Sequence, residues 1–278
     1  MSVAALTGCG ADSDDRPGVV ASFYPLAEAA RQVGGEIVRV HNLTPPGAEP
    51  HDLELTATQV ADIQDADVVL VLGDGFQPAV EKAAAGRQGT VELLGVLGPA
   101  AGDTDDPHVW LDPVLFATVV DHVASALGRA VPAERPAFSV GAEAYKAQLA
   151  TLDRDYRAGL SDCTRREILT AHEAFGRLAQ RYGLTQESIA GLSPETEPEP
   201  DRLAELADLV RRRGVTTIFT ETLVSPRVAD ALARETGART DVLDPIEGLS
   251  EDDGRGGMTY LSVMRDNLAK LRAALGCR

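Results

Sequence analysis

The alternation of two hydrophobic patterns constrains the fold of this chain more than any other feature of its sequence. Short apolar runs typical of buried strands, such as residues 66–73 (ADVVLVLG) and 167–170 (EILT), alternate with stretches of helical spacing. Residues 133–160 break the alternation, because they read as a single long helix with no strand nearby. Alternating strands and helices build parallel sheets covered by helices. We therefore predict an α/β fold with two lobes, each with a mainly parallel central sheet flanked by helices, joined by one long rigid linking helix.

The same patterns divide the 278 residues into four parts, and a chain of this length can form two modest domains. We predict a lipobox and disordered tether at 1–17, an N-terminal α/β lobe at 18–131, a linking helix at 132–162 and a C-terminal α/β lobe at 163–278.

The charge of the chain excludes two classes of partner. A net charge of -17 and a pI near 4.7 argue against nucleic acid and against an anionic membrane surface, because both require clustered lysine and arginine. No run of about 18 apolar residues is present, so we predict no membrane-spanning segment. The acidic surface either raises the local concentration of cations or only maintains solubility.

The three cysteines point to an extracytoplasmic location. Leu6 to Cys9 has the apolar, small, small, cysteine order of a bacterial lipobox, so we expect lipid on Cys9 as the only membrane attachment. Only eight residues precede Cys9, so we expect a signal peptide that is cut short. Cys163 and Cys277 remain as an even pair, which predicts a disulfide between the start of the second half and the last helix. Two free buried thiols are the alternative.

One stretch, residues 106–113 (DPHVWLDP), combines a histidine with unusual rigidity. It holds His108 and the only tryptophan, Trp110, between Pro107 and Pro113. Each proline fixes its own φ and pushes the preceding residue towards an extended conformation, so His108 is expected on a stiff backbone. A single imidazole cannot fix a cation, and alone it reads equally as a hydrogen-bonded surface residue.

Other candidate ligands fall just beyond the predicted carboxyl ends of strands, where open α/β sheets bind their ligands. Three imidazoles and one carboxylate match a tetrahedral zinc shell, which we expect in the cleft between the lobes. The predicted ligands are His51, His108, His172 and Asp244. Each also has an ordinary interpretation: a loop histidine for His51, a helix cap for His172 and a turn for Asp244.

Glu221, at the end of the strand VTTIFTE, is a candidate acceptor for the second N–H of a ligand histidine. An ordinary carboxylate at a strand end is the alternative.

Five motifs resemble a known family, the zinc and manganese solute-binding proteins of bacterial ABC transporters, in the branch that imports zinc. They are PPGAEPHDLE around His51, DPHVWLDP around His108, TAHEAFGRLAQRYGL around His172, IAGLSPETEPEP, and VLDPIEGL around Asp244. They occur in the family's order and span nearly the whole chain from Val19. The resemblance implies two α/β lobes joined by a long helix, with the metal between them. It also implies ligation by the three histidines and by the carboxylate of Asp244.

The residue at position 172 bears on the choice of metal. Manganese-importing relatives typically have a carboxylate where this chain has His172, and imidazole suits zinc while harder oxygen ligands suit manganese. Many zinc importers also carry a histidine-rich loop before the DPHVW motif, whereas residues 99–106 (PAAGDTDD) contain no histidine.

These observations predict a solute-binding protein, not an enzyme, which captures Zn²⁺ outside the cytoplasmic membrane and delivers it to an ABC permease. We expect a monomer, anchored to the outer face of the membrane as a lipoprotein or free in the periplasm. Zinc affinity should fall as the pH drops through about 6.5, because only neutral imidazoles bind metal. One alternative is a binding protein of the same fold for manganese or another divalent ion. The other is a zinc hydrolase, although Gly176 stands where an HExxH helix needs its second histidine.

Overall fold

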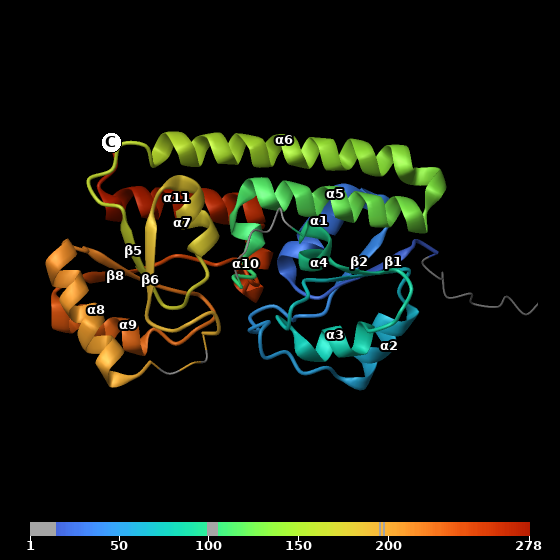
Figure 1. The fold of residues 1–278 in the computed structure, drawn as a ribbon. Helices are drawn as coiled ribbons and strands as arrows, with labels where there is room; N and C mark the ends of the chain where they lie inside the picture. Colours follow the sequence, from blue (N-terminus) through green and yellow to red (C-terminus); the bar gives the residue numbers. More distant parts are fainter. Residues whose placement is uncertain (1–14, 99–104, 195, 197) are drawn as a thin grey trace, which may run out of the picture.

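Two four-stranded parallel sheets form the centres of two lobes in the computed structural model (Figure 1). The structure describes residues 15–98, 105–194, 196 and 198–278. The strands of the first sheet are β1 (Gly18–Ala21), β2 (Arg39–Asn42), β3 (Val68–Val71) and β4 (Thr90–Glu92). Those of the second are β5 (Glu167–Thr170), β6 (Thr185–Ser188), β7 (Thr217–Thr220) and β8 (Arg239–Val242).

The two sheets have the same topology. Their strand orders are β2-β1-β3-β4 and β6-β5-β7-β8, and every neighbouring pair is parallel. In each sheet the strand order reverses beside the first strand, and ligands of open α/β sheets bind at the carboxyl ends of the strands near such a point. Each lobe therefore offers one edge at which loops can present ligands.

Helices cover the sheets and connect the lobes. The first lobe has α1 (Tyr24–Gly34), α2 (Ala57–Asp65), α3 (Pro78–Ala84), α4 (Leu93–Leu97) and α5 (Pro113–Ala130), with the short 3₁₀ helices η1 (Gly35–Ile37) and η3 (Val109–Leu111). After η4 (Pro132–Glu134) comes the longest helix, α6 (Arg135–Gly159). The second lobe has α7 (Gly176–Tyr182), α8 (Pro200–Arg213), α9 (Arg227–Thr236), α10 (Glu251–Arg255) and α11 (Tyr260–Leu275).

The long helix α6 packs on both lobes, which is the role predicted for the linking helix. It contacts α1 and α5 of the first lobe and α11 of the second, and Figure 1 shows it running along one side of the whole molecule. Its apolar face is buried, and the hydroxyl of Tyr156 donates to the carbonyl of Met264 in α11 at 2.7 Å. The largest hydrophobic cluster is continuous through both lobes and includes Trp110, Leu149 and Tyr260. The lobes therefore share one core beneath α6.

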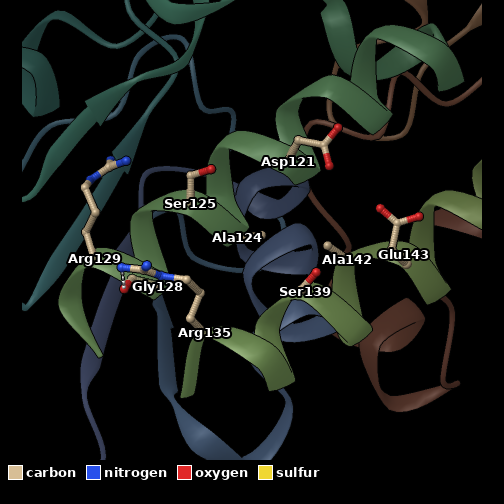
Figure 2. Close-up of a pocket in the computed structure, with 9 residues that line it drawn as sticks. All are labelled: Asp121, Ala124, Ser125, Gly128, Arg129, Arg135, Ser139, Ala142 and Glu143. Carbon is tan, nitrogen blue, oxygen red and sulfur yellow. Dashed lines mark hydrogen bonds between the residues drawn. The ribbon is translucent and has the colours of Figure 1, made fainter. Parts of the chain in front are cut away.

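A surface groove of about 420 Å³ separates α5 from α6 (Figure 2). Arg129 and Arg135 lie at one end, and Asp121 and Glu143 at the other. The acidic end is neutralised by Lys146, whose ammonium group lies 2.7 Å from Asp121 and 2.9 Å from Glu143. The groove lies on the helical side of the molecule and contains none of the candidate ligands.

The end of the chain is joined to the segment after α6 by the predicted disulfide between Cys163 and Cys277. Within the described ranges, none of the helices has both the length and the apolar character needed to cross a bilayer. Cys9 and its lipobox lie outside the described residues.

The predicted fold class is confirmed, and the strands are shorter than predicted. Residues 66–73 contain a strand only at Val68–Val71, whereas the predicted strand 167–170 is β5 itself. Residues 133–160 were predicted as one helix, and α6 occupies all but their ends. The exact limits of the lobes stay a prediction.

Candidate metal centre

Four buried or half-buried side chains, from both lobes, converge on one place. His51 lies in the loop after β2, and His108 directly precedes η3. His172 lies between β5 and α7, and Glu247 lies in the loop after β8. Each lobe therefore contributes two of the four groups. His51, His172 and Glu247 lie in loops that follow strands, and His108 lies in the segment between α4 and η3.

The four groups approach closely enough to hold one cation, because one ligand atom from each lies within 4.8 Å of the others. The oxygen Oε1 of Glu247 lies 3.5 Å from Nε2 of His51, 3.2 Å from Nε2 of His108 and 3.3 Å from Nε2 of His172. The Nε2 atoms of His108 and His172 are 3.4 Å apart.

Three polar atoms of these groups also lack hydrogen-bond partners among the described residues. They are the two carboxylate oxygens of Glu247 and Nε2 of His51. All three are buried, and none makes a hydrogen bond of acceptable geometry within the described part of the chain. Buried polar atoms without partners are uncommon because they are costly. The arrangement is what a cation at the centre would satisfy.

Two of the histidines are each fixed by one carboxylate. Nδ1 of His108 lies 2.7 Å from Oδ1 of Asp106, and the backbone N–H of His108 donates to the same oxygen at 2.9 Å. Nδ1 of His172 lies 2.7 Å from Oε2 of Glu221, and its backbone N–H donates to Oε1 at 3.0 Å. A carboxylate on Nδ1 fixes the ring and the tautomer, and leaves Nε2 to face the cleft. The predicted position of Glu221 beside a site histidine is therefore observed, whereas Asp106 was not identified as the partner of His108.

His51 is held differently. Its side chain is 11% exposed, compared with 0% for His108 and His172. Its ring packs edge-on against Phe76, with ring centroids 4.4 Å apart. Its backbone N–H donates to Glu49 at 3.2 Å, but no carboxylate of the described residues pairs with its Nδ1.

This geometry agrees with the comparison to known families. The family described as the zinc-uptake complex component A, periplasmic, matches residues 19–274. The chain belongs to this family. The description names a component of an uptake complex and not an enzyme, in agreement with the prediction from sequence.

Individual relatives of the zinc-uptake family cover most of the chain. The zinc-binding lipoprotein AdcA of Streptococcus pneumoniae (strain ATCC BAA-255 / R6) is 37% identical over 94% of this chain and 56% of its own length. The high-affinity zinc uptake system protein ZnuA of Bacillus subtilis (strain 168) is 34% identical over 94% of this chain and 88% of its own length. This chain thus spans about half the length of AdcA.

A solved structure of a relative is also similar in fold. The Zn(II)-bound ZnuA-like domain of Streptococcus pneumoniae AdcA is 37% identical, with a TM-score of 0.81, over 94% of this chain and 99% of that domain. The two-lobed architecture of this zinc-uptake family member is therefore shared with a relative crystallised with zinc.

The carboxylate beside the three imidazoles is Glu247, and not Asp244 as predicted from the sequence. Oδ1 of Asp244 accepts the backbone N–H of Ile246 at 2.7 Å, and Oδ2 accepts the hydroxyl of Thr222 at 3.2 Å. Asp244 is therefore occupied in holding the turn that follows β8. Glu247 follows three residues after Asp244 in the same loop. Both carboxylates lie in the motif VLDPIEGL, and the strand-end position of Asp244 favoured the wrong one of the two.

The turn before Glu247 is strained and firmly held. Ile246 has φ +59°, a conformation that β-branched residues rarely adopt. Asn267 in α11 bonds both sides of Asp244, accepting its N–H at 3.0 Å and donating to its carbonyl at 2.7 Å. The indole N–H of Trp110, from the other lobe, donates to the carbonyl of Pro245 at 2.7 Å. Contacts from both lobes thus fix the position of Glu247.

Burial and pairing shift the pKa values of the site in opposite directions. Burial lowers the pKa of His172, but its bond to Glu221 and then its ion pair with Glu247 outweigh that effect and raise the pKa to about 10. The pKa of His108 is raised in the same way, because the contacts with Asp106 and then with Glu247 outweigh the lowering effect of burial. Burial raises the pKa of Glu247, but the three imidazoles outweigh it and hold that pKa well below its usual range. Without metal, His172 therefore holds a proton against the Glu247 carboxylate.

The pKa values of two neighbouring carboxyl groups are raised. Burial, and next the charge of Glu247, raise the pKa of Glu49 to about 9. Burial raises the pKa of Asp244 to about 6, although its bond from the N–H of Ile246 opposes the shift.

Proposed function

We propose that this protein captures zinc in the cleft between its lobes, with His51, His108, His172 and Glu247 as ligands. The distances among these groups carry the proposal. A tetrahedral shell with ligands about 2.0–2.1 Å from zinc has edges of about 3.4 Å. Oε1 of Glu247 lies 3.2 to 3.5 Å from the three Nε2 atoms, and Nε2 of His108 lies 3.4 Å from Nε2 of His172.

The types of ligand favour zinc over manganese. Imidazole is a good ligand for zinc, while manganese prefers carboxylate, carbonyl and water oxygens. Three of the four groups here are imidazoles, and the fourth supplies the single negative charge. A zinc hydrolase would keep a coordination position open for water, whereas Glu247 fills that position. The site therefore supports binding and release rather than hydrolysis.

Membership of this family supports a role for the protein as a component of an importer. The family is described as the periplasmic component of a zinc-uptake complex, and AdcA is described as a lipoprotein. We propose that the protein works outside the cytoplasmic membrane as a monomer, anchored by lipid on Cys9, and passes zinc to an ABC permease. Two ligands come from residues 18–131 and two from residues 163–278, with residues 132–162 as the link between the two lobes. Separation of the lobes would therefore divide the shell into halves.

Calorimetry on metal-stripped protein at neutral pH tests the proposal. We expect one zinc per chain and weaker binding of manganese. Glu247→Gln should weaken zinc binding at least about tenfold, because it removes the charged ligand. Asp244→Asn is the matched control and should stay within about threefold of wild type, because an amide oxygen can still accept the N–H of Ile246.

Two results would overturn the proposal. One is the absence of zinc binding by the wild-type protein. The other is a larger loss for Asp244→Asn than for Glu247→Gln, which would make Asp244 the ligand.

A further inference from the structure

Helix α7 of the second lobe is hydrogen-bonded to the segment of the first lobe that carries His108. Nε of Arg177 donates to the backbone carbonyl of Asp106 at 2.7 Å, and its Nη2 reaches the same oxygen. The backbone N–H of Arg177 donates to Oδ2 of Asp106 at 3.2 Å. Arg177 is only 5% exposed, so these contacts are shielded from water.

The same aspartate orients the histidine. Oδ1 of Asp106 accepts the backbone N–H of His108 and pairs with its Nδ1, while Oδ2 and the carbonyl face Arg177. A continuous chain of contacts therefore runs from α7 through Asp106 to the ring of His108. His172 lies in the loop between β5 and α7, so the helix that follows one proposed ligand also contacts the residue that orients another.

The approach of α7 to Asp106 is close enough to exclude a side chain. A Cβ on Gly176 would lie 2.8 Å from Oδ2 of Asp106, which is too short for a normal contact. The glycine that replaces a second histidine in the HExxG sequence thus permits this approach.

A second arginine one helical turn further along α7 holds the other end of the same segment. Nε of Arg181 lies 3.2 Å from Asp112 and 2.7 Å from Asp153 of α6. Asp112 caps α5 by accepting the N–H groups of Val114 and Leu115. Arg181 thus fixes the scaffold, while only Arg177 contacts the residue that orients His108.

We propose that Arg177 is a positioning residue for zinc binding, which acts across the lobes through Asp106 to orient His108. The inference rests on the proposed function. Closure of the lobes places Arg177 on Asp106 and so aligns His108 with His172. Opening of the lobes breaks the bonds between Arg177 and Asp106 as the shell divides, so closure and metal affinity are coupled.

The test compares the zinc dissociation constant, by chelator competition, with the thermal unfolding midpoint of the metal-free protein. Arg177→Met should weaken zinc binding about tenfold, at the lower end of the 10–100-fold range for groups that orient a metal ligand. Arg177→Lys keeps one donor for the Asp106 carbonyl and should restore part of the affinity. Arg181→Met, on the same helix, should lower the unfolding midpoint but change zinc affinity less than about threefold.

A double-mutant cycle separates positioning from general stabilisation. In an Asp106→Ala background, Arg177→Met should change affinity less than about twofold. The carbonyl that Arg177 holds remains there, but the carboxylate that carries its effect to the His108 ring is gone. The cobalt-loaded Arg177→Met protein should also show an altered visible absorption spectrum, which reports the geometry of the ligand shell.

Three outcomes would overturn the inference while leaving the proposed function intact. They are wild-type affinity in Arg177→Lys and Arg177→Met, equal losses of affinity in Arg177→Met and Arg181→Met, and a full effect of Arg177→Met in the Asp106→Ala background. Failure of the wild-type protein to bind zinc in the same assay would instead remove the proposed function itself.

Discussion

His108 and His172 lie in different lobes, yet they are held in the same way. In each case one carboxylate lies 2.7 Å from Nδ1 and also accepts the backbone N–H of the same histidine. The carboxylate of His108 is two residues away in the chain, whereas that of His172 is 49 residues away at the end of β7. The same contact is thus made by a residue nearby in the sequence in one lobe and by a residue distant in the sequence in the other.

His51 provides the contrast. It packs on Phe76 and is partly exposed, and its Nδ1 has no carboxylate among the described residues. A ligand that is already fixed loses less conformational entropy when metal binds. We infer that His108 and His172 form the preorganised part of the centre, and that His51 is the ligand whose position depends most on the metal.

The largest expected effect comes from removing a fixed imidazole. His108→Ala and His172→Ala should each weaken zinc binding by more than about 100-fold, beyond the effect of losing a group that only orients a ligand. His51→Ala should cost less than either, because that ring pays an ordering cost on binding that the other two do not. Chelator competition measures all three. A greater loss for His51→Ala would contradict the distinction between fixed and unfixed histidines.

Removing the carboxylates that fix the rings should have the next largest effect. Asp106→Asn and Glu221→Gln should each weaken zinc binding about 10–100-fold, and by similar amounts, because the two contacts share one geometry. Glu49→Gln is the control. The pKa of Glu49 is raised to about 9, so its carboxyl group is neutral at pH 7 and the amide should change affinity less than about threefold. Unequal losses for Asp106→Asn and Glu221→Gln would show that the two histidines are not equivalent.

The pH dependence of zinc binding should extend higher than free imidazole suggests. Because the pKa of His172 is raised to about 10, its proton is still bound at pH 8 in the metal-free protein and must leave when zinc binds. Affinity should therefore fall about tenfold for each pH unit from 8 to 6 for each proton displaced. Calorimetry in buffers of different ionisation enthalpy counts those protons. A constant affinity down to pH 6.5 would contradict the raised pKa.

The disulfide should have the smallest effect on binding. Cys163 and Cys277 join the segment after α6 to the end of α11, away from the four converging groups. Replacing both with serine should lower the free energy of unfolding by about 2–4 kcal/mol. Zinc affinity should stay within about twofold of wild type. Denaturant unfolding and chelator competition on the same preparation separate the two effects, and a tenfold loss of affinity would tie the disulfide to the site.

The sequence predicts the fold well because its elements carry strong local signals. The apolar run of β3 and the proline-free stretch of α6 need no tertiary information, and Asp112 before Pro113 caps α5 as a local motif. Strand ends were less accurate, because residues beyond a ladder, such as Leu72, are as apolar as those within it.

The site was predictable in its histidines and in Glu221, but not in Asp106 or in the carboxylate beside the three imidazoles. His51, His108 and His172 are rare residues in distinctive motifs, whereas acidic residues are abundant, and strand-end position alone cannot rank Asp244 against Glu247. The choice depends on a turn in which Ile246 adopts a positive φ and Trp110 reaches across from the other lobe. Asp106 was not identified as a partner because it stands among other acidic residues in the stretch PAAGDTDD, whereas in the structure contact with Arg177 buries it.

The most direct test of the account is a crystal structure of the zinc-loaded protein with an anomalous map at the zinc edge. We predict one zinc atom with Nε2 of His51, His108 and His172 at about 2.0–2.1 Å and an oxygen of Glu247 at about 2.0–2.2 Å. Asp244 should remain bonded to the N–H of Ile246. Zinc bound to Asp244 in place of Glu247, or a water molecule in the fourth position, would contradict the central claim.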